Sequence, residues 1–113
     1  MAKPAFNKIY KETIDSILLK LPRVKPGKMF GYPAYYINGK LFACLFEDGV
    51  CVKVPESFAK KLIMNKKGVP FERMGRTMRE WIQLNRKDPH DFIKDKTVFK
   101  QSLDYVLTLT REK

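Results

Sequence analysis

The sequence predicts one α+β domain, in which a mostly antiparallel sheet packs against N-terminal, middle and C-terminal helices. This class is indicated by an amphipathic apolar stripe near the start of the chain, two hairpin-type dipeptides between apolar segments, and a second helical stripe near the end. The chain has 113 residues, a common size for one domain with its own core. We therefore expect residues 1–113 to form a single domain.

The first expected element is a helix over about residues 5–21. Its apolar residues recur at helical spacing and leave charged residues on the other faces. They are Phe6, Ile9, Tyr10, Ile14, Ile17, Leu18 and Leu21. Pro22 ends the helix, because the residue before a proline disfavours the α conformation. A turn is expected from Arg23 to Gly27.

The segment from Met29 to Val54 predicts an antiparallel meander. Asn38-Gly39 and Asp48-Gly49 are favoured as two-residue turns, because both central residues of a type I′ turn have positive φ. Taking both dipeptides as turns pairs Tyr36 with Leu41, Ala34 with Ala43, Leu45 with Val52, and Ala43 with Val54.

This register divides the meander into two faces. One carries Ala34, Tyr36, Leu41, Ala43, Leu45, Val50, Val52 and Val54. The other carries Tyr35, Ile37, Phe42, Cys44, Phe46, Cys51 and Lys53. Cys44 and Cys51 then lie diagonally, beyond disulfide reach without movement, with Lys53 opposite Cys44. We expect both cysteines to be buried thiols.

The second half predicts a helix, a strand and a final helix. The middle helix starts at Pro55-Glu56-Ser57, turns Phe58, Leu62 and Ile63 inward and closes at Gly68. Residues 69–74 form a loop or short strand, residues 78–84 alternate as a strand, and residues 85–95 form a polar loop. Asp95 is placed to cap the last helix. That helix turns Val98, Phe99, Leu103, Val106 and Leu107 inward.

Several runs occur in an order that resembles the N-terminal domain of the TfoX/Sxy family, bacterial proteins linked to natural competence. They are Met29-Phe30-Gly31-Tyr32, Tyr36-Ile37-Asn38-Gly39-Lys40-Leu41-Phe42-Ala43, Lys53-Val54 and Pro70-Phe71-Glu72-Arg73-Met74-Gly75-Arg76-Thr77-Met78. The resemblance spans roughly residues 5–110 and implies a helix-covered antiparallel sheet that serves as a regulatory module. Glu80-Trp81-Ile82 is similar to a strand of YjbR-like proteins, which implies a similar architecture.

Charge is the most unusual feature of the composition. The formal net charge is +11, from 23 Lys and Arg against 12 Asp and Glu. Such an excess attracts polyanions, although dispersed lysines also serve simply to solvate a surface. The longest apolar run, Leu41 to Phe46, is too short to span a membrane, which needs about 20 residues. We expect a cytoplasmic protein that does not bind membranes.

Two groups of side chains are candidate binding sites. Arg73, Arg76 and Arg79 are spaced by three and suited to a phosphate, with Trp81 on the strand face of Arg79 and available to stack on a base. The alternative is that the arginines pair with nearby carboxylates while Trp81 fills the core. Tyr35, Phe42 and Phe46 form an aromatic row beside Lys53, which is either a stacking platform or a face covered by a helix or by a second copy in a homodimer.

Residue types that carry catalysis do not cluster in this sequence. His90 is the single histidine, and neither Gly-Lys pair lies in a glycine-rich phosphate loop. We expect no catalytic residues, metal or cofactor. The predicted function is a non-catalytic regulatory or adaptor module that binds a protein partner. The alternatives are a nucleic-acid-binding protein that uses the arginine segment, and a small ligand-binding protein or enzyme whose site the sequence does not reveal.

Overall fold

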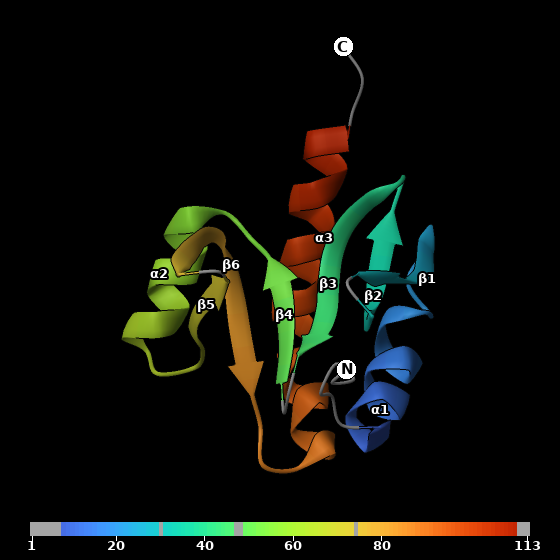
Figure 1. Ribbon diagram of the computed structural model, residues 1–113, viewed down its shortest axis with the longest axis horizontal. Coiled ribbons are helices and arrows are strands. Elements are labelled where there is room, and N and C mark those ends of the chain that lie inside the picture. The colour runs from blue at the N-terminus through green and yellow to red at the C-terminus, as the bar shows by residue number, and fades with distance from the viewer. Residues whose placement is uncertain (1–7, 30, 47–48, 74, 111–113) are drawn as a thin grey trace.

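The computed structural model describes residues 8–29, 31–46, 49–73 and 75–110 and has the predicted α+β class. Six strands form one antiparallel sheet in the order β1-β2-β3-β4-β6-β5 (Figure 1). The strands are β1 (Val24–Met29), β2 (Tyr32–Ile37), β3 (Lys40–Phe46), β4 (Gly49–Lys53), β5 (Val69–Arg73) and β6 (Arg76–Asn85). The helices are α1 (Lys8–Leu18), α2 (Glu56–Met64), the 3-10 helix η1 (Pro89–Asp95) and α3 (Lys96–Thr110).

The sheet begins earlier than expected, because the predicted turn at residues 23–27 is strand β1. An edge strand tolerates Pro26 and Gly27, since one side of it makes no ladder hydrogen bonds. Gly27 also leaves room for the ring of Tyr36, whose Cε1 would lie 2.8 Å from an added Cβ. The Tyr36 hydroxyl donates to the Lys28 carbonyl at 2.9 Å, which fixes the ring across β1.

The turn at Asn38-Gly39 is confirmed, with φ of 51° and 79°, and Tyr36 pairs with Leu41 as predicted. The pairing of Ala34 with Ala43 is wrong. Leu41, Phe42 and Ala43 lie opposite only Tyr36 and Tyr35, so β3 contains a bulge at Phe42, and Ala34 pairs with Cys44.

Because of the bulge, the β2 residues that share a face with Ala43 and Leu45 are not the ones that were predicted. Tyr35 and Ile37 join Phe42, Ala43 and Leu45 in the main core, while Ala34 and Tyr36 lie on the opposite face. The bulge also frees the Phe42 carbonyl, which accepts a hydrogen bond at 3.3 Å from the fully buried hydroxyl of Ser102 in α3. The helix layer therefore satisfies a polar group that the sheet leaves unpaired.

The second hairpin is shifted from its predicted register by two residues. Phe46 pairs with Gly49, so Gly49 belongs to β4 rather than to a turn, and Asp48, the other predicted turn residue, lies outside the described residues. Leu45 pairs with Val50 and Ala43 with Val52, although all four keep the common face that was predicted. Glycine at position 49 instead allows β4 to approach β6 closely, because an added Cβ would lie 2.6 Å from the Leu84 carbonyl oxygen of β6.

The same shift places the cysteines directly opposite one another. Cys44 pairs with Cys51, both are buried, and they form no disulfide. Lys53 instead lies beside Trp81, its pairing partner on β6. The expected diagonal arrangement of the cysteines is wrong, whereas the expectation of two buried thiols is confirmed.

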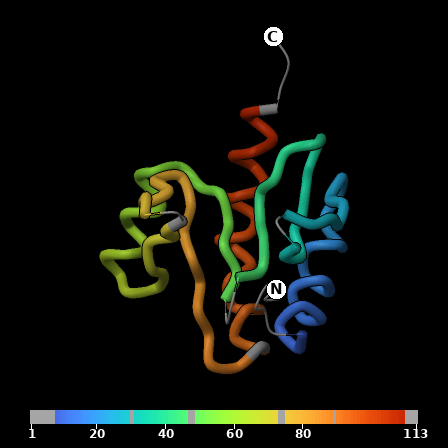
Figure 2. Tube along the Cα trace, in the orientation of Figure 1, coloured from blue at the N-terminus to red at the C-terminus, as the bar shows by residue number. Residues whose placement is uncertain are grey.

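Helices cover one face of the sheet and form the main core with it. α3 lies behind β3 and β4 in Figure 1, and the chain that follows β6 turns back to bring η1 against α1 (Figure 2). Helical residues of this core include Tyr10, Ile14, Leu18, Ala59, Leu62, Phe92, Val98, Phe99, Leu103 and Val106. Phe92 is fully buried in the predicted polar loop, while Ile9 and Ile63 are exposed rather than inward-facing. Phe6 lies outside the described residues.

The opposite face forms a smaller cluster whose described members all come from strands. Ala34, Cys44, Cys51, Phe71 and Trp81 are buried there, with Met29, Tyr36, Leu41 and Phe46 partly buried around them. Ring contacts run from Tyr32 to Phe46 at 5.2 Å, from Phe46 to Phe71 at 5.6 Å, and from Phe71 to Trp81 at 5.9 Å. Aromatic side chains from four strands therefore shield the cysteines.

Arg86, just after β6, connects four separate segments. Its guanidinium group makes two 2.9 Å bonds to the Asp95 carboxylate and donates to the Lys67 carbonyl at 2.9 Å. Its own carbonyl accepts the hydroxyl of Tyr10 from α1. Asp95, predicted as a helix cap, is buried and serves as the partner of this arginine.

Each edge strand of the sheet contains a proline. Pro26 lies in β1 and Pro70 in β5, and both strands are at the outer positions of the order. Proline has no N–H group to donate to an added strand. β1 also exposes Lys25 and Lys28.

We predict that Arg86→Met lowers the free energy of unfolding by about 3 kcal/mol, because it leaves the buried Asp95 carboxylate without its partner. Urea denaturation measures the change. Arg79→Met is the control, since Arg79 is exposed and makes no ion pair with a described residue, and its effect should stay within about 0.5 kcal/mol. Equal effects of the two substitutions would show that the Arg86 connection is not stabilising.

We also predict a contribution of Tyr35 to stability that is lost at alkaline pH. Burial raises the pKa of its phenol, and a hydrogen bond to Asp15 with the charge of that carboxylate raises it further. Ionisation therefore favours the unfolded chain, so this contribution is complete below about pH 10 and declines above it.

Tyr35→Phe should cost about 1–2 kcal/mol at neutral pH, through loss of the bond to Asp15. Because the variant lacks this phenol, its stability should fall less than that of the wild type between about pH 9 and pH 11. Denaturant unfolding at a series of pH values provides both quantities. Parallel stability curves for the two proteins would contradict the assignment.

Candidate functional site

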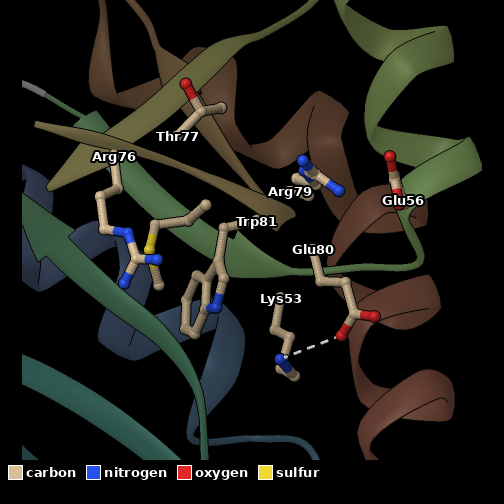
Figure 3. A pocket seen from close by; sticks show the side chains of 8 residues that line it. Lys53, Glu56, Arg76, Thr77, Arg79, Glu80 and Trp81 are labelled. Atoms are coloured by element: carbon tan, nitrogen blue, oxygen red, sulfur yellow. Dashed lines mark ion pairs between the residues drawn. The ribbon is translucent and has the colours of Figure 1, made fainter.

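Four of the predicted site residues surround one recess beside β6. We call it the basic recess, and its volume is about 670 Å³. It is lined by Lys53, Glu56, Arg76, Thr77, Met78, Arg79, Glu80 and Trp81 (Figure 3). The backbone of Arg73 pairs with Arg76 next to this site, but the Arg73 side chain lies outside the described part of the structure.

An irregularity between β5 and β6 builds the basic recess. Pro70 pairs with Ile82 and Glu72 with Thr77, so the four β6 residues 78–81 lie opposite Phe71 alone. The Glu80 carbonyl accepts a 3.0 Å bond from the Val54 backbone N–H, which anchors the extra residues to the end of β4. The bulge breaks the simple alternation that was predicted for this strand.

Much of the charge in the basic recess is already compensated. Lys53 forms an ion pair with Glu80 at 3.3 Å and lies 5.7 Å from the centre of the Trp81 ring. Glu56 pairs with Lys60 at 3.3 Å. Arg76 and Arg79 are exposed and form no ion pair with any described residue, so these two supply the uncompensated positive charge.

The two available arginines lie on either side of Trp81 in Figure 3, with Arg76 away from α2 and Arg79 towards Glu56. Trp81 itself is only 8% exposed and packs against Phe71. A base needs an open aromatic face for stacking. The geometry thus suits contact of an anion with one arginine at a time better than stacking on the indole.

The predicted aromatic row does not form a surface. Tyr35 and Phe42 are 1% and 0% exposed and belong to the helix-covered core, whereas Phe46 and Lys53 are partly exposed elsewhere. The bulge at Phe42 is the physical cause of the separation of Phe42 from Phe46, because it turns Phe42 to the same face as Ala43. The single row is therefore wrong, because Phe46 lies in the other cluster, whereas the alternative of a helix-covered face is confirmed for Tyr35 and Phe42.

A second recess was not predicted from the sequence. It lies between α1 and α3, has a volume of about 620 Å³, and is called the α1–α3 groove. Its lining consists of Ser16, Ile17, Lys20, Leu21, Pro22, Ile93, Lys96, Phe99, Lys100 and Leu103. Both helices pack on η1 and only sparsely on each other, which leaves the groove open above η1.

The walls of the α1–α3 groove are apolar and its rim is basic. Ile17 and Leu21 extend the buried stripe of α1 and are partly buried, while Phe99 and Leu103 are part of the main core. Ile93, from η1, is 46% exposed. Lys20, Lys96 and Lys100 are exposed around these residues, and no carboxylate contributes to the lining.

One sequence signal points to this groove in retrospect. Ile93 is an isolated aliphatic residue in the polar segment between residues 85 and 95, where nothing in the alternation pattern requires one. The remaining wall residues are indistinguishable from ordinary core residues, because they belong to the same helical stripes. Their partial exposure depends on the tertiary packing of α1 against η1.

Comparisons with known proteins give no match for this chain. No family model, no curated protein and no solved structure is detectably similar to it. Among the described residues, no group of three His, Cys, Asp or Glu side chains is placed to hold a metal ion. No described helix is long and apolar enough to cross a membrane.

We predict that binding of DNA or RNA to this chain is weak and non-specific. Titrations across a salt series should show binding that disappears near physiological salt, because counterion release dominates it. Arg76→Ala and Arg79→Ala should leave this behaviour almost unchanged, as should the control Lys40→Ala at the β2–β3 turn. Binding that survives at physiological salt and weakens in both arginine variants alone would instead identify the basic recess as a nucleic-acid site.

Proposed function

We propose that this chain is a non-catalytic adaptor or regulatory module that binds a protein partner through the α1–α3 groove. The observation that carries the proposal is the groove itself, an open apolar recess formed by two helices and η1. Apolar grooves between helices commonly receive an amphipathic helix from another protein. The expected resemblance to a regulatory domain is consistent with such a role.

The exposed part of the groove supports a binding role more than a structural one. Ile93 leaves nearly half of its surface in water although Phe99 and Leu103 lie beside it in the lining. An apolar residue above a preformed apolar recess gains free energy when a partner covers it, at roughly 25 cal/mol per Å² of buried apolar surface. Its exposure is therefore a favourable starting point for association.

The basic recess supports the alternative function less strongly. It offers two uncompensated arginines, but they flank an indole that is largely buried by Phe71. Two of the three aromatic residues that would form a stacking platform, Tyr35 and Phe42, are in the core. Non-specific attraction of nucleic acid by a net charge of +11 requires no dedicated site.

We predict that Ile93→Glu abolishes capture of the protein partner. Immobilised wild type, Ile93→Glu and Met64→Glu are compared in nuclease-treated extract of the source cell, with bound proteins quantified by mass spectrometry. Met64 is the matched control, because it is 80% exposed on α2 and outside the groove. A charged group placed in an apolar interface should reduce recovery by about tenfold or more, whereas the control should retain it.

The proposal fails if no protein distinguishes the two variants. It also fails if capture depends on nucleic acid, which would be revealed by recovery of a protein from untreated extract that is lost from nuclease-treated extract. Circular dichroism and thermal unfolding confirm that both variants are folded. An exposed position is expected to tolerate glutamate with a change in stability of about 0.5 kcal/mol.

A further inference from the structure

We infer that the α1–α3 groove recognises an acidic amphipathic helix. This inference rests on the proposed function and specifies the chemistry of the partner. The groove combines apolar walls with a rim that carries charge of one sign. Both features constrain the segment that fits.

The charged residues that line the groove are all basic. Lys20 lies after the end of α1, and Lys96 and Lys100 lie on successive turns of α3. All three are exposed, and none forms an ion pair with a described residue. The basic recess, by contrast, contains Glu56 and Glu80. A ligand for the groove therefore meets three positive charges and no negative one.

The lining selects among possible occupants. A second copy of this chain would bring another strongly positive surface to a positive rim, which electrostatic repulsion opposes. A nucleic acid satisfies the lysines but leaves Ile17, Leu21 and Ile93 without apolar contact, and the one aromatic residue of the lining, Phe99, is 1% exposed. A helix with leucine or phenylalanine on one face and glutamate or aspartate beside it contacts the apolar walls and pairs with the lysines of the rim.

The helical form follows from the shape of the groove. Its walls are two helices that contact each other sparsely, and its base is η1, so it is a surface formed by helices and offers no free strand edge. Helices dock on such surfaces with apolar anchors at i, i+3, i+4 and i+7. Acidic residues on the flanks of that apolar stripe would lie near Lys20 on one side and Lys96 and Lys100 on the other.

The test uses three synthetic amphipathic peptides of roughly 18 residues, long enough to form a helix. They share one apolar face and differ only in the flanking residues, which are Glu, Gln or Lys. Binding to the intact protein is measured by isothermal titration and mapped by amide chemical shifts. We expect the Glu peptide to bind about tenfold more tightly than the Gln peptide at low salt, through three rim pairs, with shifts at α1, η1 and α3.

Two double variants with the same change in net charge separate local from global electrostatics. Lys96→Glu with Lys100→Glu reverses the charge of the α3 side of the rim, and glutamate is favourable at position 96 in the first turn of α3 and acceptable at the exposed position 100. Lys66→Glu with Lys67→Glu changes exposed residues after α2, outside the groove. The first pair should remove the preference for the Glu peptide, whereas the second should retain most of it. Ile93→Glu should weaken all three peptides.

Each contrary outcome has a distinct meaning. Equal affinity for the Glu and Gln peptides would overturn the acidic partner while leaving the apolar docking of the proposed function intact. Equal losses in the two double variants would assign the preference to overall charge and overturn the role of the rim. Shifts away from the groove, or a dimer in light scattering that Ile93→Glu disrupts, would overturn the peptide as occupant.

Discussion

The described part of the molecule depends on one paired charge, between Arg86 and Asp95. Arg86 follows the last strand, and Asp95 immediately precedes the last helix, so their two-bond contact sets the direction in which the chain leaves the sheet. The same guanidinium group donates to the Lys67 carbonyl, and the backbone carbonyl of Arg86 accepts from the Tyr10 hydroxyl. Through these contacts one residue orients α1, η1, α3 and the α2–β5 connection.

The position of the groove follows from that arrangement. Tyr10 packs its ring edge-on against Phe92 at 5.2 Å and donates its hydroxyl to the Arg86 carbonyl, which holds η1 against α1. α3 starts directly after η1 and lies on β3 and β4, where Ser102 satisfies the carbonyl at the Phe42 bulge. α1 and α3 are each packed on η1 and only sparsely on each other, and the groove lies between them.

Sequence periodicity was sufficient for the fold class and insufficient for the register. The stripes of α1 and α3 and the Asn38-Gly39 turn depend on local rules, and the structure confirms them except at two points. Ile9 is exposed, and α1 ends at Leu18 rather than at the predicted Leu21. The bulge at Phe42 and the shifted pairing of β3 with β4 involve contacts with α3 and β6, which no local pattern records. Each irregularity changed either the face or the partner of the residues that follow, and this is why the cysteine and aromatic pairings were wrong.

The candidate sites divide in the same way. Arg76, Arg79 and Trp81 were predicted as part of one group, because they lie in one short segment, and the structure brings them together. Lys53 was assigned to the aromatic row and joins them instead, because it pairs with Trp81 across from that segment. The α1–α3 groove combines residues from α1, near the start of the chain, with residues from η1 and α3, near its end, and its wall residues have the composition of a core. Whether such residues are covered depends on helix packing, which is a tertiary property.

The prolines at the two outer strands have a consequence for behaviour at high concentration. Fibril growth and domain swapping both extend a sheet by adding a strand to an unpaired edge. Pro26 and Pro70 interrupt the donors that an incoming strand would need, and Lys25 and Lys28 add charge to one of these edges. The two edges of this sheet therefore offer fewer backbone donors for strand addition than edges without proline would.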